Sequence, residues 1–281
     1  MKRLRAFTKY EYRDPFWFLI RYLITQRLTK VEELEKSIAQ RAAKSLEARN
    51  ELAKFGILKR VGKGYQLYTQ KLEAAKSYLR GRGKQLEEAI GDLRTLDEIK
   101  GHLSHEGIRF TEKKLKSGYF RNPLMAEVEA VVRSVCSPKS IGFVINPPAI
   151  YPPKIEVPGV GFFTLIKQLD IAIPSAHNPK VLMEVKEYWG EKGGGSKMSN
   201  AVYETYCVAR ELKDLEAGFR KKVYHYVVLD GRNQWQTRRG DLGDFIDFLN
   251  QGLISGLFVG KSVAMELREE LNRVLSNWPL G

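Results

Sequence analysis

The sequence predicts a mixed protein of the α+β or α/β class in two parts, a basic and mainly helical N-terminal part and a C-terminal mixed β-sheet flanked by helices. Three observations predict this. The 281 residues, 43% hydrophobic and 28% charged, have a globular composition and are enough for two domains. The positive charge is concentrated in the first 120 residues, and apolar residues recur there at helical spacing. From about residue 121, strand patterns alternate with helices.

The charge distribution separates the two parts. Residues 1–120 contain 27 Lys and Arg against 15 Asp and Glu, a net charge of +12, whereas residues 121–281 contain 20 against 18, a net charge of +2. This asymmetry indicates a nucleic-acid-binding module joined to a nearly neutral second domain. A basic domain that is merely kept soluble by its charge is the alternative.

Several other classes of protein are disfavoured. No apolar run approaches the roughly 18–20 residues that span a bilayer, and the charged N-terminus lacks the apolar region of a secretory signal. Cys136 and Cys207 lie far apart without CxxC spacing, which supports neither a disulfide framework nor a cysteine zinc site. His102 and His105 share a helix face without a third ligand and are expected at the surface. We expect a cytoplasmic protein with no membrane partner.

The N-terminal part has a recognisable element order. Residues 15–28 carry apolar residues at helical spacing, and residues 29–40 follow as a second helix with Thr29 as a plausible N-cap. A third helix is predicted over "RAAKSLEARNELAKFG", ending at Gly56. The stretch "ILKRVGKGYQLYT" then predicts two short strands around a tight glycine turn.

Three helices and a hairpin resemble the winged helix-turn-helix family over residues 15–70, so residues 1–70 are expected to form a DNA-binding domain. The resemblance implies that the third helix enters the major groove while the hairpin follows the backbone. Some of these side chains are expected to lie only on a solvated helix face. The candidate DNA contacts are Arg41, Lys44, Ser45, Arg49 and Lys63.

Residues 71–120 are expected to be a helical, basic connector of undetermined role. The domain over residues 121–281 begins with a predicted helix near residues 123–135. Predicted strands follow at "SIGFVINPP", "GFFTLIKQLDIAI", "KVLMEVKEYWG" and "KKVYHYVVLDG", with a helix before the last of them and further helices towards the end. This order predicts a mixed sheet flanked by helices.

One predicted strand carries charges where a core strand should not. Glu184 and Lys186 are two residues apart in "KVLMEVKEYWG", so they lie on one face of the strand. A charge pair in a core usually costs more desolvation than its attraction returns, so stability is a weak motive for it. If the preceding strand pairs with this one as a hairpin, Asp170 lies beside Glu184. A Glu–Lys pair at an exposed sheet edge is the ordinary alternative.

Asp170 followed by Glu184-Val185-Lys186 resembles the motif of the PD-(D/E)xK nuclease superfamily, with Leu169 in place of the name-giving proline. The resemblance implies a restriction-endonuclease-like fold. It also implies that Asp170 and Glu184 bind Mg²⁺, with Mn²⁺ as a substitute, and that Asp170, Glu184 and Lys186 are catalytic. Carboxylate oxygens are the ligands Mg²⁺ prefers, and the ion polarises the phosphate and acidifies a bound water.

A DNA-reading module joined to such a domain implies a Type II restriction endonuclease that makes Mg²⁺-dependent, sequence-specific double-strand cuts. The implied partners are double-stranded DNA, a second copy in a homodimer, and a cognate DNA methyltransferase. A modification-dependent or repair nuclease, and a winged-helix regulator with an inactive nuclease-like domain, remain alternatives. Glu127, Glu129 and Glu204 are weaker candidates for supporting the site, and Glu187 is expected to be structural on the opposite side of the strand.

Overall fold

The chain forms two compact units in the computed structural model, which describes residues 1–62, 64–110, 122–146, 152–189 and 195–276. The N-terminal unit comprises Arg3–Gln85 with Asn250–Gly252, and the sheet unit comprises Met1–Lys2, Leu86–Leu249 and Leu253–Gly281. Helix α4 (Thr69–Asp92) contributes residues to both units. The division therefore falls inside a helix, between residues 85 and 86, rather than at the limits of the connector expected over residues 71–120.

The N-terminal unit has the element order expected from its sequence. It consists of α1 (Pro15–Thr25), α2 (Leu34–Lys44), α3 (Leu46–Lys54), β1 (Leu58–Val61), β2 (Gly64–Leu67) and the first part of α4. Helix α1 begins where Asp14 accepts a hydrogen bond from the Phe16 amide, with Pro15 in the first turn. Strands β1 and β2 pair antiparallel. Apolar residues of all three helices, β1 and α4 form one buried cluster, which holds the unit together.

The predicted boundary between the second and third helices was wrong. The break lies at Ser45, whose extended backbone ends α2 and begins α3. The Ser45 side chain accepts a hydrogen bond from the Ala48 amide at 3.2 Å, as an N-cap residue does. Arg41 and Lys44 therefore lie in the last turn of α2, and only Arg49 of the candidate cations lies on α3.

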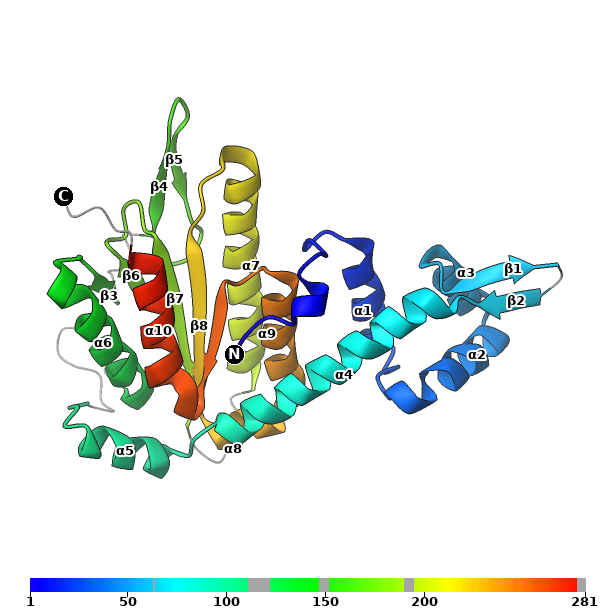
Figure 1. Ribbon diagram of the computed structural model, residues 1–281, viewed down its shortest axis with the longest axis horizontal. Coiled ribbons are helices and arrows are strands. Elements are labelled where there is room, and N and C mark those ends of the chain that lie inside the picture. Colours follow the sequence, from blue (N-terminus) through cyan, green and yellow to red (C-terminus); the bar gives the residue numbers. More distant parts are fainter. Residues whose placement is uncertain (63, 111–121, 147–151, 190–194, 277–281) are drawn as a thin grey trace. The chain divides into compact units, whose positions relative to one another are not determined.

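The sheet unit is built on five strands among the described residues, in the order β3-β6-β7-β8-β9. Strands β3, β6 and β7 pair antiparallel, while β7, β8 and β9 run parallel (Figure 1). Its elements are α5 (Leu96–His105), α6 (Pro123–Cys136), β3 (Val144–Ile145), β6 (Ile171–Ile173), β7 (Val181–Glu187), α7 (Ser196–Phe219), β8 (Tyr224–Asp230), α8 (Arg232–Thr237), α9 (Arg239–Gln251), β9 (Gly256–Val259) and α10 (Val263–Leu275). The mixed sheet flanked by helices agrees with the predicted class.

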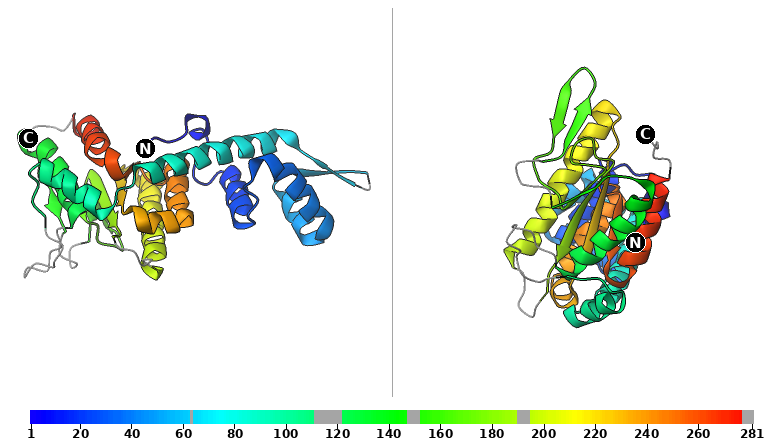
Figure 2. Two further views of the ribbon diagram at one scale, coloured as in Figure 1. Left: turned by 90° about the horizontal axis from the view of Figure 1, so that it is seen from below. Right: turned by 90° about the vertical axis from the view of Figure 1, so that its left-hand side faces the viewer.

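Both faces of this sheet are covered. Helices α5, α6 and α10 pack on one face, against alternate residues such as Val181, Met183 and Tyr226. Helix α7 packs on the other face, where Leu182 and Ala172 join its apolar side chains. Figure 2 shows α10 and α7 on opposite sides of the strands. Since successive residues of β7 alternate between the faces, Glu184 and Lys186 lie on the side of α7.

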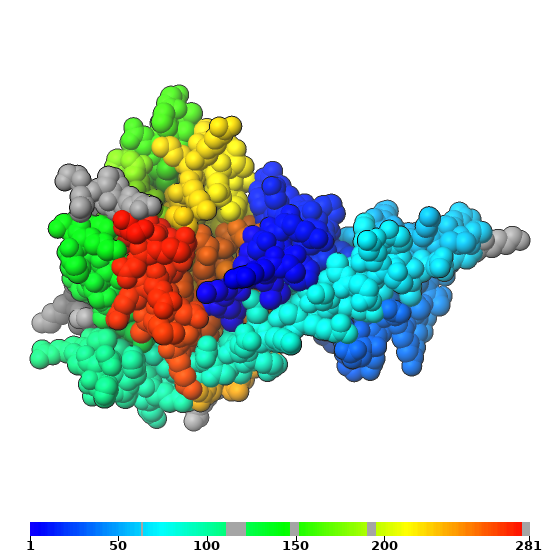
Figure 3. Space-filling view, viewed as in Figure 1, coloured from blue at the N-terminus to red at the C-terminus, as the bar shows by residue number. Residues whose placement is uncertain are grey.

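A hairpin interrupts the strand that was expected over "GFFTLIKQLDIAI". Strand β5 (Gly161–Thr164) pairs with β4 (Lys154–Val157) in a separate two-stranded sheet, and β6 begins only at Ile171. The expectation of one long strand was therefore wrong. In Figure 1 this hairpin extends beyond the five-stranded sheet, and in Figure 3 it forms the green tip at the top of the sheet unit.

Candidate active site

Strand pairing places Asp170 beside Glu184, as the sequence predicted. Ile171 is the partner of Met183 in the antiparallel β6–β7 ladder, so the residue before β6 lies opposite Glu184. The Asp170 amide donates to the Met183 carbonyl at 3.1 Å, which extends the ladder by one residue. The expected hairpin between the two strands is thus confirmed, although β6 is only three residues long.

The Asp170 carboxylate is held by the backbone of the neighbouring strand. Its Oδ2 atom accepts a hydrogen bond from the Val185 amide at 2.7 Å. Burial raises the pKa of Asp170 above its ordinary value, and the charge of Lys186 and the Val185 amide only partly offset this. A cation next to Asp170 would therefore stabilise its ionised form.

Glu184 is almost completely buried, at 4% exposure, yet its contacts with His225, Thr205 and Lys186 favour the ionised form. Oε1 lies 2.8 Å from Nε2 of His225 on β8, and Oε2 accepts a hydrogen bond from the Thr205 hydroxyl on α7 at 2.9 Å. Lys186 Nζ lies 2.8 Å from the same Oε2. Burial alone would raise the pKa of Glu184, but Lys186 and His225 outweigh it and lower that pKa to about 2.

Lys186 is held as a cation between carboxylates. Burial opposes its charge, but Glu184 and Asp170 raise its pKa above the ordinary value. The Glu204 carboxylate on α7 lies 3.8 Å from Nζ of Lys186 through Oε2, and its Oε1 lies 3.1 Å from Nζ of Lys167. Glu204 is therefore part of the cluster. Because Lys186 holds its proton, it is suited to stabilising negative charge and not to acting as a base.

Two members of this cluster were not expected from the sequence. Thr205 on α7 and His225 on β8 follow Lys186 by 19 and 39 residues, and both are completely buried. The signal for His225 was an imidazole inside the apolar run "YHYVVL", which places a polar ring in the core and requires a partner.

The donor chemistry of the cluster fits a magnesium ion. Asp170 and Glu184 present hard oxygen atoms from adjacent strands, and Glu204 adds a third carboxylate near Lys186. Within the described ranges, no group of three or more His, Cys, Asp and Glu side chains is arranged as a metal centre. Two protein carboxylates are enough for Mg²⁺, which retains several waters and binds substrate phosphate as well. A divalent ion here would also offset the electrostatic repulsion between the two buried carboxylates.

The candidate DNA contacts are in several different settings. Arg41 donates a hydrogen bond to the Gln26 side chain, and Ser45 caps α3. Arg49 donates from Nε to the Ala42 carbonyl at 2.9 Å and lies over the ring of Tyr65, 5.4 Å from its centre. Lys44 is exposed in the last turn of α2. Three of these side chains thus stabilise the N-terminal unit, and Lys63 lies outside the described residues.

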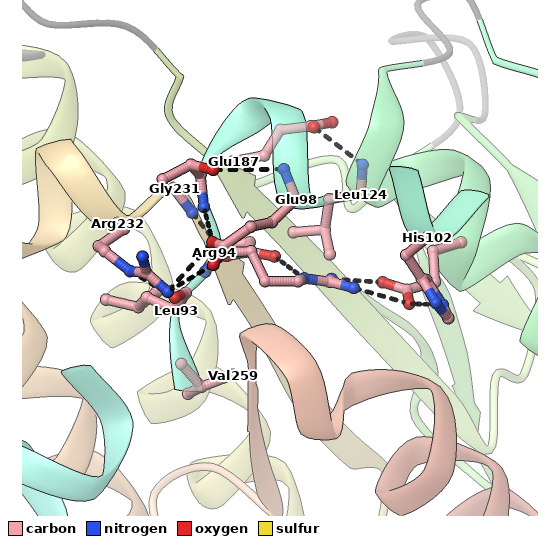
Figure 4. Close-up of polar contacts among 12 residues, drawn as sticks. Leu93, Arg94, Glu98, His102, Leu124, Glu187, Gly231, Arg232 and Val259 are labelled. Carbon is pink, nitrogen blue, oxygen red and sulfur yellow. Dashed lines mark hydrogen bonds and ion pairs between the residues drawn. The ribbon is translucent and has the colours of Figure 1, made fainter. Parts of the chain in front are cut away.

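A second charged cluster lies on the other face of the sheet, around Arg94 (Figure 4). The Arg94 guanidinium binds both oxygens of Glu127, at 3.0 and 2.6 Å, and its Nε donates to Asp230 at 2.6 Å. His102 lies 3.1 Å from Glu127. Arg94, Glu127 and Asp230 are at most 3% exposed. Glu127, a weaker candidate for supporting the motif site, is instead the buried partner of Arg94. Glu129 pairs with Arg133 and is also buried, at 6% exposure.

Glu187 joins β7 to α6, in agreement with the structural role expected for it. Its Oε2 accepts hydrogen bonds from the Leu124 amide at 3.1 Å and from the Trp189 indole at 2.7 Å (Figure 4 shows the Leu124 contact). Burial raises the pKa of Glu187 to about 7, since these hydrogen bonds only partly compensate for lost solvation.

The family of the chain follows from a match that covers most of the sheet unit. A family model described as "Domain of unknown function (DUF7687)" matches residues 87–276, more than half of the chain. The chain belongs to the DUF7687 family. The matched range contains Asp170, Glu184, Lys186 and the whole Arg94 cluster. No curated protein and no solved structure matches the chain. Within the described residues, no helix combines the length and apolar character required to cross a membrane.

Proposed function

We propose that this DUF7687 protein is a Mg²⁺-dependent endodeoxyribonuclease that hydrolyses phosphodiester bonds of double-stranded DNA in the manner of a Type II restriction endonuclease. The observation that carries the proposal is the convergence of Asp170, Glu184 and Lys186 at the paired ends of β6 and β7. The order of a helix, antiparallel strands, the motif strand, a helix and a parallel strand supports a restriction-endonuclease-like fold.

The chemistry assigns a distinct role to each residue. Asp170 and Glu184 would hold the metal ion, which polarises the scissile phosphate and lowers the pKa of a bound water. Lys186, kept protonated by its carboxylate neighbours, stabilises negative charge on the phosphate. His225 and Thr205 orient the Glu184 carboxylate from behind.

The basic N-terminal unit supplies the DNA contact in this proposal. Its exposed cations, Lys44 among them, would neutralise phosphates and release counterions. The proposal also includes the two further partners that a restriction enzyme implies. These are a second copy of the chain and a cognate methyltransferase that protects the site.

Incubation with supercoiled plasmid DNA tests the proposal. Cutting is expected with Mg²⁺ or Mn²⁺ and is expected to stop in excess chelator, whereas Ca²⁺ should support binding without cutting. Lys186→Ala should abolish cutting, while Lys261→Ala, an exposed lysine of the same unit, should cut as the wild type does. Full activity in excess chelator would exclude the metal site. DNA binding without cutting on methylated and unmethylated substrates would favour the regulator with an inactive nuclease-like domain.

A further inference from the structure

The N-terminal unit contains a cavity of about 910 Å³ that the proposed cleavage chemistry does not use. It lies between α1, the end of α3 and the start of α4, and all its lining residues belong to this unit. Ligand pockets for small molecules commonly have about 300–1,000 Å³, so the cavity has room for a nucleotide. Lys54, the last residue of α3, and Tyr68, which follows β2, both line it.

Aromatic rings dominate the lining. Tyr22 and Phe55 lie side by side, with ring centres 5.1 Å apart and planes tilted by 46°. Phe18 and Tyr68 also line the cavity and are 56% and 44% exposed, although large aromatic side chains usually contribute to a core. Ring faces of this kind provide stacking surfaces for a planar heterocycle.

The charged residues of the lining complement a nucleotide. Lys9, Lys54 and Lys71 bring positive charge, which suits a phosphate. Lys71 remains near the cavity wall, where Nζ donates to the Phe55 carbonyl at 3.3 Å. Asp14 and Glu51 bring carboxylates, which can accept hydrogen bonds from the amino groups of a base. An uncharged aliphatic ligand would use none of these charges, and a planar base that carries a phosphate would use both the charges and the aromatic rings.

We infer that this cavity binds an unpaired nucleobase of a DNA strand, stacked on its aromatic side chains with the adjoining phosphate on its lysines. The inference rests on the proposed function in that the substrate is DNA, and it adds a second contact that recognises a base outside the duplex. A strand is favoured over a free nucleotide because the cavity belongs to the more basic part of the chain, where residues 1–120 have a net charge of +12 (27 Lys and Arg against 15 Asp and Glu).

Fluorescence measurements on the full-length protein test the inference without using cleavage. The probes are a fully paired duplex and the same duplex with a central two-base mismatch that contains 2-aminopurine, both in Ca²⁺. The test variant is Phe18→Ala combined with Tyr68→Ala, two exposed positions whose replacement leaves the core intact. Phe219→Ala replaces an exposed aromatic residue of the sheet unit and serves as the matched control.

The wild type and the control are expected to bind the mismatched duplex about 10-fold more tightly than the paired one, with quenched 2-aminopurine emission. The double variant should lose this preference and the quenching while it binds the paired duplex as before. Equal affinity of the wild type for both duplexes would overturn the inference. Equal losses by the double variant on both duplexes would do the same, as would binding of free deoxynucleoside monophosphate with no preference for the mismatch. Failure to cut plasmid DNA bears on the proposed nuclease function and leaves this readout unaffected.

Discussion

The Nε2 atom of His225 lies 2.8 Å from Oε1 of Glu184, while Nδ1 of the same buried ring has no hydrogen-bond partner among the described residues. An N–H at Nδ1 would be an unsatisfied buried donor, which costs about 1–3 kcal/mol. The favoured ring therefore carries its proton on Nε2 and donates it to Glu184. His225 is then a positioning residue for the carboxylate that we propose as a metal ligand.

Replacement of His225 should weaken metal use before it affects DNA binding. His225→Ala removes the donor to Glu184, and cleavage is expected to fall about 10–100-fold with a higher Mg²⁺ concentration for half-maximal rate. His225→Gln, which retains a side-chain N–H donor, should recover part of both. A magnesium titration of plasmid cutting measures the effect, with thermal unfolding recorded in parallel. Equal loss in both variants with an unchanged Mg²⁺ dependence would assign His225 a purely structural role.

The three motif residues should be needed for cutting and not for DNA binding. Asp170→Asn, Glu184→Gln and Lys186→Ala are each expected to abolish cleavage, because each removes a metal ligand or the cation next to it. Binding to the cognate duplex should remain, since the proposed reading surface is in the N-terminal unit. Gel-based cleavage and anisotropy binding assays separate the two effects. Near-wild-type cutting by any one variant would remove that residue from the mechanism.

Glu187 should make the sheet unit less stable as the pH rises. The pKa of this carboxyl is raised by burial from 4.5 to about 7, so the folded state retains a proton that the unfolded state has already lost. Between these values the stability contributed by the protonated form decreases with pH, by up to about 3 kcal/mol in total. Glu187→Gln does not titrate, so it should not lose this stability as the pH rises. Its side-chain oxygen can still accept the hydrogen bonds from Leu124 and Trp189.

Urea unfolding at pH 5 and pH 8 measures this effect. The difference in unfolding free energy, Glu187→Gln minus wild type, should become more positive at pH 8. Glu88→Gln, at an exposed position of α4, should show no such change. A pH-independent difference between wild type and Glu187→Gln would contradict the raised pKa.

Of the cations near the α2–α3 break, Arg49 should contribute mainly to stability and Lys44 mainly to DNA binding. Arg49→Ala loses the hydrogen bond to the Ala42 carbonyl, and we expect it to destabilise the N-terminal unit by about 1.5–3 kcal/mol. Lys44→Ala should change stability by less than about 0.5 kcal/mol but should reduce the salt dependence of DNA binding by about one phosphate contact. Thermal unfolding and a salt titration on specific and scrambled duplexes provide both readouts. An unchanged salt dependence for Lys44→Ala would remove it from the DNA surface.

The sequence allowed the prediction of those parts of the site that depend on local periodicity. Alternation along a strand placed Glu184 and Lys186 on one face, and a hairpin with the preceding strand placed Asp170 beside them. His225 was not predictable in the same way. Its contact with Glu184 depends on the parallel register of β7 and β8. These two strands are joined by a long connection that includes α7. Sequence spacing does not determine that register.

Two errors have a common physical cause. The break between α2 and α3 depends on one capping hydrogen bond at Ser45, which did not stand out from the helical pattern around it. Arg94 was counted only as a charge of the expected connector, although it is the buried partner of Glu127 and Asp230. In both cases polar contacts, and not an apolar repeat, determine the local structure.

Arg94 also limits how the protein can be divided into fragments. A C-terminal fragment that begins at residue 121 would lack this arginine, and Glu127 and Asp230 would be left as buried carboxylates without their cation. Loss of one partner of such an ion pair typically costs about 3–5 kcal/mol, a large share of the stability of a domain. Fragments intended for crystallisation or domain exchange should therefore start before Arg94. Natural chains that share this domain should likewise retain the segment before α5 as an integral part of the domain.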